Sequence, residues 1–103
     1  MIARMWRGWV RTGDRDAYVA YIEATGMAQY RETPGNQGAH MLTRDLGNGR
    51  TEIVTLSFWQ SRESIHGFAG DDISRAVFYP EDDRYLVDRE TTVTHYEVVA
   101  GAG

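Results

Sequence analysis

The chain has 103 residues, 42% of them apolar and 25% charged, which is the composition of one ordinary globular domain. The formal net charge is −4 and the basic residues form no block, so neither nucleic acid nor an anionic membrane surface is expected as a partner. Cysteine is absent, which excludes disulfides, thiolate metal sites, iron–sulfur clusters and a cysteine nucleophile.

The N-terminal segment alternates between two faces and predicts a strand over residues 2–11, with Trp6 on one face and Trp9 on the other. Neither this start nor any later run has the pattern of a signal peptide or the apolar length of a membrane span, so a cytoplasmic protein is expected. Asp14 is expected to cap the helix that follows, and Gly26 to end or bend it.

The middle of the chain reads as a hairpin followed by a helix. A loop at residues 33–38 is rich in residues that tolerate unusual backbone angles. Two strands joined by the turn "GNG" are predicted over residues 39–46 and 50–60. Ser61 is expected to cap a helix that ends near Gly70.

The last third is predicted to close the fold and to wall any pocket on the helix side of the sheet. Asp72, or Asp71, is expected to cap a second short helix over residues 73–79, which ends before the proline. Residues 80–88 are assigned one more turn, and residues 91–99 the closing strand.

The predicted order is βαββαβ, which is typical of a ferredoxin-like α+β fold with a four-stranded antiparallel sheet and helices on one face. Trp6 and Trp9 lie on opposite faces of the first strand, and the helices can cover only one of these faces. We therefore predict a homodimer in which two sheets pack face to face.

Four sequence features carry a family resemblance: "ARMWRGWV", "PGNQG", "LSFWQSRESIHGFAG" and the closing "VTHYEV". Over residues 2–99 they resemble the antibiotic biosynthesis monooxygenase-like family of the dimeric α+β barrel superfamily. The stretch "FAGDDISRAVFYPEDDRYL", residues 68–86, resembles a bacterial subgroup of that family. The resemblance implies one such domain over residues 1–103. It also implies oxygenation of an electron-rich aromatic, such as an anthrone or quinol, without metal or flavin, so no cofactor is expected. A related branch degrades haem with an Asn on strand one, where this chain offers Arg4 and Trp6, so haem degradation is not expected.

Two of the three histidines, His95 and His66, are candidates for a catalytic base, because an unperturbed imidazole titrates near neutral pH. His95 lies in the middle of the closing strand, and is either a pocket base or donor, or a core or interface histidine bonded to a carboxylate. His66 is either a base at the pocket rim or an exposed helix residue, and His40 is expected to be structural. Since no paired histidines or histidine–carboxylate clusters occur, no metal site is predicted.

Arg4 is a candidate to hold a substrate phenolate or carboxylate, and Trp6 to stack on a planar ring. The alternative for Arg4 is an ion pair with Asp or Glu in the dimer interface. Phe68 and Tyr79 are substrate-binding candidates with core packing as their alternative, and Trp59, whose place in the family is mainly structural, is included with them. Four acidic residues are expected to form a solvated face: Asp71, Glu81, Asp82 and Asp83.

Three functions stay open from the sequence. The first is a cofactor-independent monooxygenase that oxidises a planar phenolic or polyketide-type substrate with O2. The second is an isomerase, cyclase or lyase on the same fold that uses a His or Asp base without oxygen. The third is a non-catalytic protein that binds a small molecule or is associated with stress.

Overall fold

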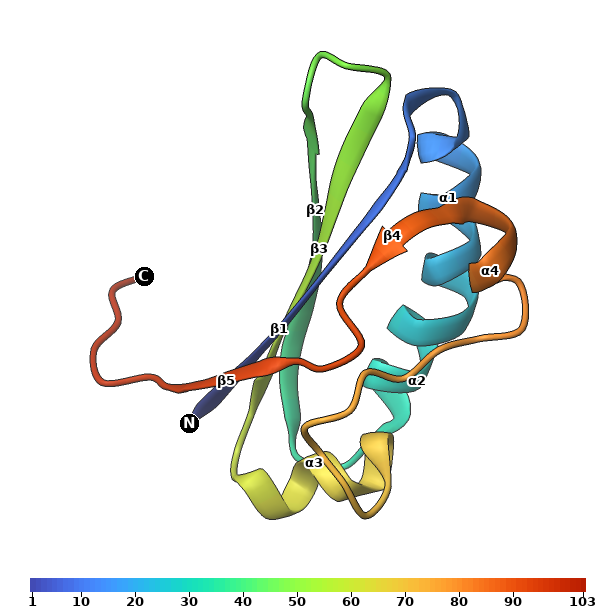
Figure 1. Cartoon of the computed structure of the whole chain (residues 1–103). Coiled ribbons are helices and arrows are strands. Elements are labelled where there is room, and N and C mark those ends of the chain that lie inside the picture. The colour runs from blue at the N-terminus through green and yellow to red at the C-terminus, as the bar shows by residue number, and fades with distance from the viewer.

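Five strands form one antiparallel sheet, and the helices pack against one of its faces (Figure 1). The computed structural model describes residues 1–103. The sheet order is β2-β3-β1-β4, and β5 also pairs with β1. The strands are β1 (Ile2–Arg11), β2 (Asn36–Asp45), β3 (Arg50–Trp59), β4 (Leu86–Arg89) and β5 (Thr94–Glu97). The helices are α1 (Arg15–Ile22), α2 (Ala28–Glu32), α3 (Arg62–Ala69) and α4 (Asp82–Tyr85).

β1 is the central strand, and its two halves have different partners on one side. β3 pairs with β1 along its whole length, while β4 pairs with Gly8–Val10 and β5 with Ile2–Met5. β4 and β5 together therefore take the place of the fourth strand of a ferredoxin-like sheet. The α+β fold predicted from the sequence is confirmed. The closing strand predicted over residues 91–99 is present but shorter, as β5, whereas β4 was not predicted.

α1 and α2 form one nearly continuous helix, joined by a π-helical turn over Glu23–Met27. Gly26 lies in that turn, and the helix continues through it into α2. The predicted N-terminal cap was wrong: the Asp14 side chain does not accept an amide of α1 but pairs with the Nε of Arg11 at 2.9 Å. The helix is therefore held by its apolar face, which buries Tyr18 and Tyr30 among others.

The junction between β3 and α3 has the structure that the sequence predicts. Trp59 closes β3 and is fully buried. Ser61 caps α3 in a reciprocal pair with Ser64, and α3 ends at Gly70, whose φ of 81° suits glycine. Phe68 stacks on Tyr30 with ring centroids 4.4 Å apart, which joins α3 to α2 over the sheet.

The segment over residues 71–81, which we name the cover segment, contains no helix. The helix predicted over residues 73–79 was therefore wrong. The main-chain carbonyls of Ile73 and Arg75 accept hydrogen bonds from the Arg4 guanidinium and not from amides of a helix. The Asp72 carboxylate accepts the amide of Ser74, which closes a turn and not a helix. The next helix, α4, begins only at Asp82.

The second face of the sheet has no helix over it, as Figure 1 shows. Cross-strand neighbours on this open face include Met5 with Leu56 and Leu42 with Val54. Leu42 is 48% exposed and Tyr96 50% exposed, so a substantial apolar surface faces outward. No helix in the structure has the length and apolar character needed to cross a membrane.

Candidate functional site

A cavity lies between the sheet and the α1–α2 helix, and the cover segment closes it. Its volume is about 40 Å³, which is room for little more than one or two water molecules. Aromatic and aliphatic side chains make up most of the wall, with one arginine and one aspartate among them. The lining residues are Arg4, Trp6, Tyr18, Ile22, Gly26, Tyr30, Thr55, Phe68, Ala76, Val77, Phe78, Tyr79, Asp82 and Val93.

Arg4 is a buried cation without a carboxylate partner. It lies on the helix side of β1 and is only 3% exposed. None of the ion pairs in the structure involves it. Its donors go to neutral acceptors, the carbonyls of Ile73 and Arg75, and its guanidinium lies 5.8 Å from the centroid of the Phe68 ring. An isolated buried charge is costly, so this site favours an anion that would balance it.

His95 lies behind Arg4 and outside the cavity lining. The two residues are paired across β1 and β5, and the His95 Nε2 lies 3.1 Å from Arg4 Nη1. Because a guanidinium can only donate, Nε2 accepts this bond and the neutral ring carries its proton on Nδ1. Burial lowers the pKa of His95, and the Arg4 charge lowers it further. His95 therefore orients Arg4 as a neutral acceptor, and no carboxylate of the same chain is bonded to it.

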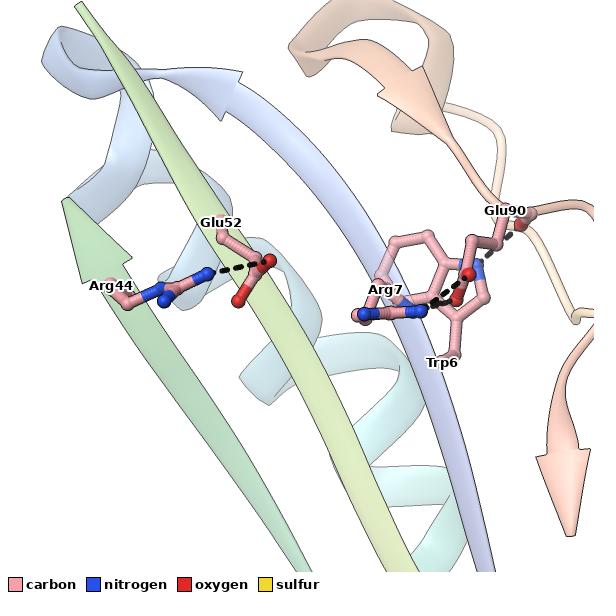
Figure 2. Close-up of polar contacts among 5 residues, drawn as sticks. All are labelled: Trp6, Arg7, Arg44, Glu52 and Glu90. Carbon is pink, nitrogen blue, oxygen red and sulfur yellow. Dashed lines mark hydrogen bonds and ion pairs between the residues drawn. The ribbon is translucent and has the colours of Figure 1, made fainter. Parts of the chain in front are cut away.

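Trp6 presents its indole ring to the cavity from the middle of β1. Its Nε1 donates to the Glu90 carbonyl at 2.6 Å, and the Glu90 carboxylate binds Arg7 on the opposite face of the sheet (Figure 2). The ring also meets Phe78 edge-on, with centroids 6.2 Å apart. The break between β4 and β5 thus fixes the orientation of Trp6, because it places the Glu90 carbonyl beside the indole.

A second polar group of the cavity centres on Asp82. This carboxylate is 2% exposed and accepts the Tyr18 hydroxyl at 3.0 Å and the Tyr79 amide at 2.6 Å. Burial raises the pKa of Asp82, and it raises the pKa of Tyr79 to about 12. The expectation that Asp82 belongs to a solvated acidic face was wrong, because α4 turns it inward, whereas Asp71, Glu81 and Asp83 are exposed.

The structure brings together only some of the predicted site residues. Four of them line the cavity: Arg4, Trp6, Phe68 and Tyr79. Trp59 lies in the core, where its Nε1 donates to the Ser57 hydroxyl, and does not reach the cavity. His66 is exposed at the end of α3, where Nδ1 donates to the Gly70 carbonyl at 2.7 Å. His40 lies on the open face, edge-on to Phe58.

Sequence reasoning missed three titratable residues of the cavity. Tyr18 and Tyr30 belong to the apolar side of the first helix, and their helical spacing signals burial but not a hydroxyl beside a ligand site. The Tyr30 hydroxyl lies near the Arg4 guanidinium, whose pKa burial lowers and Tyr30 partly restores. For Asp82 no sequence signal existed, because Asp83 beside it has the same side chain and points to solvent.

Comparison with known proteins supports the fold of the chain but does not show its activity or its substrate. No protein-family model and no curated protein sequence matches the chain. Solved structures do match it. A protein from Bacillus cereus described as an antibiotic biosynthesis monooxygenase has a TM-score of 0.68 at 14% identity, covering 99% of this chain and 96% of its own.

Two further structures agree over nearly the whole chain. A protein from Nitrosomonas europaea with the same description has a TM-score of 0.66 at 14% identity, with 97% and 100% covered. The haem degrader MhuD from Mycobacterium tuberculosis has a TM-score of 0.64 at 18% identity and full coverage of both chains. The chain therefore has the ferredoxin-like α+β fold of the proteins described as antibiotic biosynthesis monooxygenases, as its sequence motifs predicted.

Proposed function

We propose that the chain binds a planar phenolic or polyketide-type molecule in this cavity and oxidises it with O2, without a metal or an organic cofactor. The observation that carries the proposal is the Arg4 guanidinium, which is buried, lines an aromatic cavity and has no carboxylate partner. A deprotonated substrate would supply the missing negative charge. Trp6 and Phe68 offer ring faces and edges on which a planar substrate can stack.

The chemistry balances without a further reductant. In an anthrone the activated CH2 group becomes C=O, one oxygen atom of O2 enters the substrate and the other leaves as water. A quinol has no such group and would instead give the quinone and H2O2. All four electrons that reduce O2 come from the anthrone. Deprotonation precedes this reduction, because the anion is the form that gives electrons to O2. Arg4 stabilises this anion in a site of low polarity, where fixed donors act more strongly than they do in water.

Entry of a substrate requires movement of the cover segment, because ligand pockets commonly have volumes of about 300–1,000 Å³. The cover segment is tied to the cavity wall by the bonds from Arg4 to the Ile73 and Arg75 carbonyls. A substrate anion competes for the same donors. Its binding to Arg4 would therefore release the cover segment at the place where the cavity must widen.

Haem, which the structural neighbour MhuD degrades, does not fit the residues of this site. No histidine lines the cavity, and the His95 Nε2 is occupied by Arg4. The Tyr18 and Tyr79 hydroxyls are held by Asp82 and Gln29.

Oxygen uptake tests the proposal most directly. Purified protein without added metal or flavin is supplied with a panel of anthrones and quinols, and uptake is compared for wild type, Arg4→Gln and Arg31→Gln. Arg31 is the matched control, since it is exposed on α2, pairs with Glu23 and does not line the cavity. We expect Arg4→Gln to lower kcat by about 10²–10³-fold, as removal of one oxyanion donor does, and Arg31→Gln to leave it unchanged. Uptake no faster than the uncatalysed rate, or equal in both variants, contradicts the proposal.

One observation favours a second function, an acid–base reaction that needs no oxygen. Asp82 is a buried carboxyl group in the cavity wall, and such groups serve isomerases and cyclases as bases. Turnover under nitrogen separates the two functions. Product formation that continues at full rate without O2 supports the second function and removes the first.

We also propose that the chain is a homodimer whose two sheets pack through their open faces. Leu56 is central to this face, with Met5 and His40 as its cross-strand neighbours. We expect Leu56→Glu to give a monomer by light scattering at micromolar concentration, because a buried unpaired charge opposes association. Ala17→Glu is the control, since Ala17 is exposed on α1. A wild-type monomer contradicts this proposal.

A further inference from the structure

The cavity wall contains one ionisable side chain of a type that can accept a proton at neutral pH. The titratable groups of the lining are Arg4, Asp82 and three tyrosines. A guanidinium stays protonated, and a tyrosine hydroxyl is also protonated at neutral pH, so neither type accepts a proton there. No histidine belongs to the lining. The carboxylate of Asp82 is therefore the acceptor that a ligand proton meets inside the cavity.

We infer that the Asp82 carboxylate takes the proton of a hydroxyl group on an aromatic ligand bound in this cavity. The inference deepens the proposed function and rests on it for the class of ligand. In this step the ligand O–H bond breaks and its electron pair stays on the ligand oxygen. An O–H bond forms on Asp82, which becomes neutral, and the negative charge passes to the ligand. Arg4 in the same wall then offsets the charge of the ligand.

The hydrogen bonds of Asp82 leave room for this proton. Oδ1 accepts one bond from Tyr18 and Oδ2 one bond from the Tyr79 amide. Each carboxylate oxygen has two lone pairs, so both can accept once more. No guanidinium is paired with Asp82, because Arg89 pairs with Asp83 and Arg84 with Glu81. Asp82 is thus positioned from two elements but not held in an ion pair.

Burial supports the same role, since it raises the pKa of Asp82 toward the range in which a general base works well. Some of the surrounding groups lower the pKa of Asp82 and one raises it. The Tyr79 amide, the Tyr18 hydroxyl and the Arg89 charge lower the pKa, while the Asp83 charge raises it. Removal of the Tyr18 hydroxyl is therefore expected to raise the pKa of Asp82 further and leave its carboxylate in place.

Binding of naphthols under nitrogen tests the inference without any oxygenation. 2-Naphthol is neutral in solution at pH 7, and its absorption moves to longer wavelength when it ionises. We expect wild type to bind it with the naphtholate band and without release of a proton to the buffer, because Asp82 keeps the proton. Asp82→Asn cannot keep it, so naphtholate bound to this variant is expected to release one proton per ligand, measured by calorimetry in buffers of different ionisation enthalpy. The matched control, Asp83→Asn, changes the exposed neighbour and is expected to behave as wild type does. Tyr18→Phe is also expected to bind naphtholate without proton release, because its Asp82 is the stronger base.

A second probe separates proton transfer from a structural role. 2,4-Dinitro-1-naphthol is already ionised at pH 7, so it needs no base. We expect Asp82→Asn to bind it at least as tightly as wild type does, because one negative charge has left the cavity. Equal weakening of both probes by Asp82→Asn would show that Asp82 only positions its neighbours. Neutral 2-naphthol bound to wild type, or naphtholate that releases one proton on binding to wild type, also overturns the inference.

The outcomes distinguish this inference from the proposed oxidation. Naphtholate that is bound without proton release only where Asp82 is present, in a protein with no oxygen uptake on any anthrone or quinol, supports the inference and removes the oxidation. Oxygen uptake that depends on Arg4, with 2-naphthol bound as the neutral molecule, does the reverse. If neither naphthol binds, the cavity does not admit this class of ligand and both fail.

Discussion

Gly8 is the position where the structure makes the sharpest prediction about stability. A Cβ added there would lie 2.8 Å from Trp6 Cζ2, nearer still to Cη2, and 3.0 Å from Leu86 Cδ2. Such contacts must be relieved by movement of the indole. The ring is 8% exposed and held by its bond to the Glu90 carbonyl, so it has little freedom to move.

The expected effect of Gly8→Ala follows from two opposing terms. Overpacking of a core costs about 1–3 kcal/mol, while replacing glycine inside a strand returns roughly 0.5–1 kcal/mol of chain entropy. We expect a net loss of about 1–2 kcal/mol in the free energy of unfolding. For a domain of this size each kcal/mol lowers Tm by roughly 4–8 °C.

Thermal unfolding followed by circular dichroism at one fixed protein concentration measures this loss. Gly13→Ala is the control, since nothing lies within 4 Å of its added Cβ, and it should not lower Tm. Trp6→Phe removes the indole atoms that the new methyl group meets, so Gly8→Ala should cost less in that background. A Tm for Gly8→Ala equal to that of wild type, or the same cost in both backgrounds, would refute the reasoning.

Two further predictions concern the cap of α3 and the pH dependence of stability. Ser61→Ala removes the capping pair with Ser64 and should cost about 1 kcal/mol in urea denaturation; no loss would show that the cap is not needed. Because folding lowers the pKa of His95 from its ordinary 6.5, the unfolded chain binds a proton that the folded chain does not, and stability falls as pH drops below that value. His95→Gln should flatten this fall between about pH 7 and pH 5, and an unchanged slope would contradict the assignment.

Local patterns accounted for most of the fold. The alternation over residues 2–11, the "GNG" turn and the capping serine at position 61 act over a few residues, so they were readable from the sequence. The cover segment was not, because its carbonyls are bound by Arg4 from a strand about seventy residues earlier. A long-range partner of this kind overrides local helix signals.

The residues of the candidate site were likewise predictable only in part. The sequence indicated Arg4, Trp6, Phe68 and Tyr79 from residue type and face, and these four line the cavity. It favoured histidines as bases because of their intrinsic pKa, yet all three lie outside the lining. Which side chain enters a cavity depends on the packing of distant elements, and residue type alone does not report this.

The sequence by itself determined the order of the elements as far as α3, the two-faced first strand and the aromatic content of the interior, because these follow from periodicity and local hydrogen bonding. Only the tertiary structure decided that Arg4 is buried without a carboxylate and that His95 accepts its bond. It also decided that Asp82 points inward while Asp83 points to solvent. Burial and charge pairing are properties of contacts between segments far apart in the chain, and the chemistry of the site depends on those contacts.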